Sequence, residues 1–71
     1  MKAKLISVDS VRNWPRLLGR ECNLKDYQIG KPALLDFNDG LLRTSKLKKV
    51  VKTGNEIHLF TANGLYKLEE I

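Results

Sequence analysis

The sequence predicts an all-β fold, a small and strongly bent antiparallel barrel of five to six strands, as a single domain over residues 1–71. Apolar and polar residues alternate along several short segments, as in strands with one buried face. Turn-forming residues separate these segments about every ten positions, the spacing of consecutive strands in a sandwich or barrel. They are Gly19, Gly30, Asp39-Gly40, Gly54-Asn55 and Asn63-Gly64. A sheet this small must curl to cover its apolar face, and closure removes exposed edges.

The first predicted strand covers residues 4–8, with Ile6 and Val8 on one face. Residues 20–27 are ambiguous, because their two apolar residues alternate with polar ones over a short stretch, so a short strand is one possibility.

Between these segments we expect one short helical turn, near residues 15–19. Pro15 suits the first position of a helix and Gly19 suits its end. A helix this short is not stable without packing. We therefore expect three apolar side chains of this segment to plug one end of the fold: Trp14, Leu17 and Leu18.

The clearest strand covers residues 33–37, and every second residue of it is placed in the core. A three-residue hairpin loop, 38–40, should follow, with Gly40 supplying a positive φ. The chain then returns antiparallel over residues 41–52. Because no turn signal interrupts this stretch, we expect a bend or bulge near Thr44-Ser45 rather than a loop.

Two further strands are predicted, over residues 56–61 and 65–69. The first follows a turn at 53–55. The pair is joined by Asn63-Gly64, which favours a two-residue type I′ turn. Ile57 and Leu59 are expected to face inwards, and Tyr66 and Leu68 are expected to lie on one side of the second strand.

Two stretches carry a resemblance to a known fold. They read Gly30-Lys31-Pro32-Ala33-Leu34-Leu35-x-Phe37-x-Asp39-Gly40-x-x-Arg43-Thr44-Ser45 and Thr61-x-Asn63-x-x-Tyr66. Residues 30–69 thereby resemble small SH3-like barrels, including short bacterial and phage proteins. The resemblance implies an SH3-like barrel, with a five-stranded OB barrel as second choice because the usual OB helix is not predicted. It implies no catalytic or binding residue, and SH3-like barrels bind peptides, RNA, DNA or modified side chains.

Composition excludes several classes of protein. Apolar residues make up 42% of the chain, which is too much for an ordinary disordered protein. A single cysteine excludes a disulfide-stapled scaffold. No apolar run is long enough to span a membrane, and Asp9 and Arg12 interrupt the start too early for a signal peptide. We therefore expect a cytoplasmic protein with no membrane partner.

The residues offer little for catalysis. The one cysteine, Cys22, is expected to be a small buried apolar residue, and the one histidine, His58, a solvent-facing strand residue. A four-ligand zinc site needs more ligands than these two. Asp36 and Asp39 flank a hairpin tip, which is not a cleft. We expect no enzyme activity, no metal and no cofactor.

The most informative feature is a basic stretch at residues 41–53. It contains five cations and no acid, so its charge equals the net charge of the whole chain, +5. On a regular strand, Lys46, Lys48 and Lys52 would face one side and Lys49 the other, unless a bulge intervenes. Such a stripe can match phosphates along a nucleic-acid backbone. The alternative is that these lysines only keep the strand soluble and unpaired.

A second cluster consists of three arginines spaced by four residues: Arg12, Arg16 and Arg20. If the turn after Pro15 is helical, Arg16 and Arg20 lie on one side, near Trp14, which could stack a base. The alternative is that this tryptophan anchors the core.

Two functions therefore stay open. The first is a non-enzymatic module that contacts a nucleic-acid backbone through a basic strand, either RNA or DNA; its candidate residues are Arg43, Lys46, Lys48, Lys52, Arg16 and Arg20. The second is a protein-binding module, an accessory subunit or an inhibitor from a phage or mobile element, because the chain has a surplus of leucines. These are Leu17, Leu18, Leu41, Leu42 and Leu65. The sequence leaves the oligomeric state open.

Overall fold

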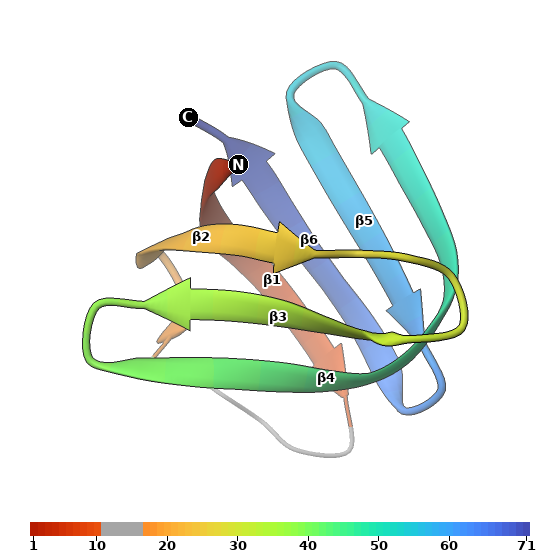
Figure 1. Cartoon of the computed structure of the whole chain (residues 1–71). Coiled ribbons are helices and arrows are strands. Elements are labelled where there is room, and N and C mark those ends of the chain that lie inside the picture. Colours follow the sequence, from red (N-terminus) through yellow and green to blue (C-terminus); the bar gives the residue numbers. More distant parts are fainter. Residues whose placement is uncertain (11–16) are drawn as a thin grey trace.

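The computed structural model describes residues 1–10 and 17–71. Six antiparallel strands in this part of the chain close into a barrel, in which each strand pairs with the next and β6 pairs with β1 (Figure 1). Their bounds are β1 Lys2–Ser10, β2 Glu21–Asp26, β3 Pro32–Phe37, β4 Gly40–Thr53, β5 Glu56–Thr61 and β6 Gly64–Glu70. The prediction of a small all-β antiparallel barrel is confirmed at this level.

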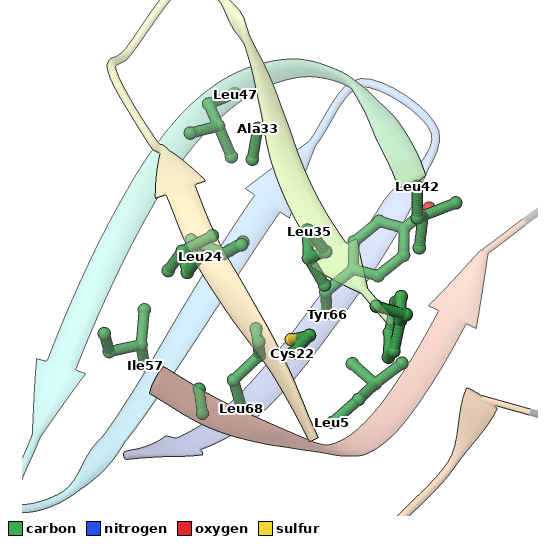
Figure 2. Close-up of a cluster of buried hydrophobic side chains, with 13 residues drawn as sticks. Leu5, Cys22, Leu24, Ala33, Leu35, Leu42, Leu47, Ile57, Tyr66 and Leu68 are labelled. Atoms are coloured by element: carbon green, nitrogen blue, oxygen red, sulfur yellow. The ribbon is translucent and has the colours of Figure 1, made fainter. Parts of the chain in front are cut away.

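Alternate residues of the strands build the core, which fills the barrel (Figure 2). The predicted inward positions of β3 and β5 are buried, including Leu35 and Leu59, each with no exposed surface. Tyr66 and Leu68 of β6, which were predicted to share one side, are both buried. The ambiguous segment 20–27 forms β2, because Cys22 and Leu24 both point into this core.

A bulge in β1 overturns one predicted face. Leu5 lies opposite Leu68 and Ser7 lies opposite Lys67, so Ile6 is an extra residue on β1. Leu5 is fully buried, Ile6 is 37% exposed, and Val8 packs against the core. The prediction that Ile6 and Val8 share a face is wrong, because an extra residue breaks the two-residue period.

Strand β4 contains two bulges. Between Arg43 and Lys46 it has one residue more than the segment of β3 that it faces, which confirms the bulge predicted near Thr44-Ser45. A second extra residue, Lys48, lies between the pairs that Leu47 and Lys49 make with β5. The bulges let one strand bend, so that its first half pairs with β3 and its second half with β5 (Figure 1).

The side chain of Thr44 replaces a backbone partner at the first bulge. Its hydroxyl oxygen accepts a hydrogen bond from the Ala33 N–H at 2.9 Å and donates one to the Ser45 carbonyl at 2.8 Å. Thr44 is 4% exposed, and Ala33 is fully buried. A buried N–H without a partner is costly, so this hydroxyl satisfies a donor that the irregular pairing would otherwise leave unpaired.

Two turns differ from their predicted types. The β3–β4 loop is two residues long, and Gly40 pairs with Phe37 and does not have a positive φ, so that prediction is wrong. The β5–β6 loop is Ala62-Asn63, because Thr61 pairs with Gly64.

In the second turn, no residue has the positive φ that a type I′ turn needs, so that prediction is also wrong. The Thr61 hydroxyl stabilises the observed turn. It accepts from the Asn63 N–H at 3.3 Å and donates to the Gly64 carbonyl at 2.8 Å. By contrast, the predicted turn at Gly54-Asn55 forms, with Gly54 at φ +60°.

The expected helical turn near residues 15–19 is not seen among the described residues; Trp14, Pro15 and Arg16 lie outside them. The chain from Leu17 forms a tight turn instead, closed by the Arg20 N–H donating to the Leu17 carbonyl at 3.2 Å. The Gly19 N–H donates to the Leu5 carbonyl of β1 at 2.7 Å, so it takes no part in a helical hydrogen bond. Leu17 packs against the core, but Leu18 is 44% exposed, so the prediction that Leu18 plugs the barrel is wrong.

Replacing Thr44 tests the role of its hydroxyl. Thr44→Val should lower the free energy of unfolding by about 1–3 kcal/mol, because the buried Ala33 N–H loses its acceptor. Thr44→Ser keeps the hydroxyl and should cost clearly less. Urea unfolding of both variants measures the difference. Equal stability of the valine variant and the parent protein would show that the bulge does not depend on this bond.

Candidate functional site

The second bulge of β4 decides which lysines face outwards together. Leu47 is buried in the core at 2% exposure, so its neighbours Lys46 and Lys48 lie on the outer side and are exposed. Lys48 is the extra residue, and Lys49 then lies opposite Phe60. Phe60 alternates with the buried residues of β5 and therefore faces outwards. Three successive exposed lysines thus share the outer side of the bend.

Lys52 is placed on the other side of the sheet. It lies opposite Ile57, which is 1% exposed and faces the core. Residues that face each other in an antiparallel pair project to the same side. Lys52 therefore projects to the core side at the barrel end, and its Nζ lies 3.9 Å from Glu70 Oε1. The expected stripe of Lys46, Lys48 and Lys52 applied to a strand without a bulge. Because a bulge intervenes, Lys49 faces outwards with Lys46 and Lys48, and Lys52 does not.

Lysines elsewhere in the described chain are paired with acids more often than those of the bend. Ion pairs join Lys2 to Glu21, Lys25 to Asp36, Lys52 to Glu70 and Arg20 to Asp39. With the described residues, seven basic side chains form no ion pair: Lys4, Lys31, Arg43, Lys46, Lys48, Lys49 and Lys67.

The backbone of Lys31 lies opposite Leu47, the residue between Lys46 and Lys48 on β4, and its side chain is exposed. The backbone N–H of Leu47 donates to the Lys31 carbonyl at 3.0 Å, and the Gly30 N–H donates to the Leu47 carbonyl at 2.9 Å. These bonds hold the loop before β3 against β4 at the bend. We call the four exposed lysines on these two neighbouring segments the basic bend: Lys31, Lys46, Lys48 and Lys49. Sequence reasoning missed Lys31, because only the pairing across β3 and β4 brings it near.

The other predicted arginines do not join this cluster. Arg43 lies opposite Leu34, on the half of β4 that precedes the first bulge. Arg20 donates through Nη2 to Asp39 Oδ1 at 2.6 Å and lies over the Phe37 ring, 5.4 Å from its centroid. Phe37 is the last residue of β3, whereas the bend lies beside Pro32, its first residue. The two ends of this six-residue strand are about 17 Å apart. Arg16 lies outside the described residues.

A depression of about 420 Å³ lies at this far end. Its apolar wall includes Leu17, Leu41 and Leu42, and Arg20 and Asp39 lie among its lining residues. The structure thus gathers three of the five predicted surface leucines. Leu18 is exposed but does not line the depression, and Leu65 lies opposite Phe60 on the outer face of β6. Leu41 is 61% exposed, whereas Leu42 is 8% exposed and belongs to the core.

The possible catalytic side chains are kept apart. Cys22 is buried in the core, whereas His58 is on the outer side of β5 with Nε2 2.9 Å from Glu56 Oε1. Burial raises the pKa of the Cys22 thiol, and the negative charge of Asp36 adds to this effect. No group of three or more possible metal ligands occurs in residues 1–10 and 17–71. Within the same residues, no helix is long and apolar enough to span a membrane.

Comparisons with known proteins give no relative for this chain: no family model, no curated protein and no solved structure matches it.

Cys22 should be unreactive in the folded protein. Because burial keeps the thiol protonated, a thiol-specific disulfide reagent near neutral pH should label it at least about 100-fold more slowly than in the urea-unfolded chain. The contribution of the Cys22 thiol to the free energy of unfolding does not change with pH below the ordinary thiol pKa. Above it, the unfolded state ionises first, so stability falls as pH rises towards the raised value. Cys22→Ala should lack that alkaline loss, and fast labelling of the native protein would contradict the burial.

Proposed function

We propose that this chain is a non-catalytic module, an SH3-like barrel, that binds the sugar–phosphate backbone of nucleic acid through the basic bend. The observation that carries the proposal is the charge arrangement of β4. Lys46, Lys48 and Lys49 face outwards together and form no ion pair with a described residue. In contrast, Lys2, Lys25 and Lys52 each lie beside a carboxylate.

This difference matters for binding phosphates. A lysine that already has a carboxylate partner must exchange it for a phosphate, which reduces the net gain. A lysine without such a partner has no carboxylate to exchange, and the nucleic acid releases its own condensed counterions when it binds. The four lysines of the basic bend therefore provide up to four phosphate contacts.

The position of the cluster favours contact with an extended backbone. Strand β4 bends where it passes from pairing with β3 to pairing with β5 (Figure 1), and Lys46, Lys48 and Lys49 lie on the outer side of this bend. Long lysine side chains at such a bend can reach successive phosphates without an enclosing groove. Backbone contacts of this kind position a nucleic acid without reading its sequence, so we propose weak selectivity among sequences.

A protein partner is the second candidate, and the depression at the far end of β3 favours it. Leu41 is 61% exposed beside that depression, where Leu17 and Phe37 supply further apolar surface. An apolar side chain of a partner could occupy this space, with the Arg20–Asp39 pair at its rim. This surface lacks the unpaired charge of the basic bend, so we place it second.

Charge-matched variants test the nucleic-acid proposal. The triple variant Lys46→Gln, Lys48→Gln, Lys49→Gln lowers the net charge from +5 to +2, since 5 − 3 = 2. The control, Lys2→Gln, Lys25→Gln, Lys52→Gln, makes the same change at paired lysines. For the parent protein, the logarithm of the binding constant should fall against the logarithm of salt concentration with a slope of about −3 to −4. In the bend variant this slope should become shallower by about two to three, and in the control variant by less than one.

Fluorescence anisotropy with labelled RNA and DNA oligonucleotides at several salt concentrations measures these slopes. Equal losses in the two triple variants would mean that net charge alone matters and would contradict a defined site. Absence of binding at low salt would contradict the proposal and leave the lysines a role in solubility. Residues 49–53 pair with β5 alone among the described strands, so one edge of this segment is unpaired. Charged side chains at such an edge prevent it from pairing with other chains. Circular dichroism of both variants checks that they fold.

A further inference from the structure

Phe60 occupies the centre of an outward-facing row beside the basic bend. It lies opposite Lys49 on β4 and opposite Leu65 on β6, so these three side chains cross the outer side of the sheet. Phe60 and Leu65 are half-buried. The next row contains Val51, His58 and Lys67. The row of Lys49, Phe60 and Leu65 is thus an apolar strip of two side chains with a lysine at its edge.

The aromatic ring presents its face to the outer side. The Nζ of Lys49 lies over the ring, 5.7 Å from its centroid. A cation takes this position because the ring face is electron-rich. Lys49 is an exposed and flexible side chain, so it covers the ring without enclosing it. A flat ligand can replace the ammonium on the ring, and the freed lysine can then contact a phosphate.

We propose that Phe60 stacks one base of the bound nucleic acid, so that the basic bend prefers single strands to duplexes. This inference rests on the proposed function. Bases in a duplex are stacked on each other and hide their faces, whereas an unpaired base can lie on an aromatic ring. Lys46 and Lys48, both on the outer side of the same bend, provide the contacts to neighbouring phosphates.

The geometry also limits what this site reads. Of the other aromatic residues in the described chain, Phe37 and Tyr66 are buried, and Tyr27 is 40% exposed in the loop between β2 and β3. The strip that contains Phe60 offers one ring, which stacks one base. Every base has a flat face, so stacking of this kind tolerates any sequence. The preference is therefore for an unpaired strand and not for a particular base.

Three substitutions of Phe60 test the inference: Phe60→Leu, Phe60→Ala and Phe60→Tyr. Leucine keeps an apolar side chain without a ring, alanine removes it, and tyrosine keeps the ring. Each variant is titrated with a labelled 12-nucleotide single strand and with the duplex of the same sequence, at one low salt concentration. The duplex serves as an internal control, because it reports the lysine contacts and the fold without a stacked base.

The parent protein should bind the single strand at least about five-fold more tightly than the duplex. Phe60→Leu and Phe60→Ala should each lose about five- to ten-fold for the single strand, the lower part of the range for loss of one stacked base. Their duplex affinity should stay within two-fold of the parent value. Phe60→Tyr should bind the single strand like the parent.

Two results would overturn the inference and leave the proposed function standing. One is equal affinity of the parent protein for both forms, with the lysine variants still weakened. The other is an equal loss for both forms in the leucine variant, which would give Phe60 a structural role only. Absence of binding to either form by the parent protein would instead overturn the proposed function itself, and the stacking proposal with it.

Discussion

The bending of β4 is the constraint on which the rest of the molecule depends. Fourteen residues of straight strand would extend about 43 Å at ~3.3 Å per residue, but the longest dimension of the described structure is 27 Å. The strand must therefore bend, and its two bulges let it pair with β3 and then with β5. The first bulge would leave the buried Ala33 N–H without a partner, and the Thr44 hydroxyl accepts its hydrogen bond.

The same bend determines the surface that we assign to nucleic acid. On a regular strand, Lys49 would face away from Lys46 and Lys48, and the cluster would be divided. The extra residue at the second bulge brings Lys49 to the outer side and moves Lys52 to the core side, beside Glu70. A backbone irregularity that a closed barrel requires thus also gathers three cations. The apolar core needs the bend, and the proposed site is a consequence of it.

Sequence alternation predicted most of the core but not these irregularities. Where the two-residue period holds, as in β3 and β5, the buried residues are those expected. It failed at Ile6 and at Lys49, because one inserted residue reverses the faces beyond it. The predicted type I′ turn at Asn63-Gly64 failed for another reason: the side chain of Thr61, outside that pair, stabilises a different turn. Lys31 joins the site through strand pairing, which no local pattern contains.

The most direct test of the account is to map the bound surface residue by residue. Amide chemical shifts of the ¹⁵N-labelled protein are followed while an unlabelled single-stranded oligonucleotide is added at low salt. We expect the largest changes at residues 30–31, 46–49 and 60, with little change at Lys52. Changes concentrated instead at Leu17, Leu41 and Leu42 would place binding at the apolar depression and contradict the basic bend as the site.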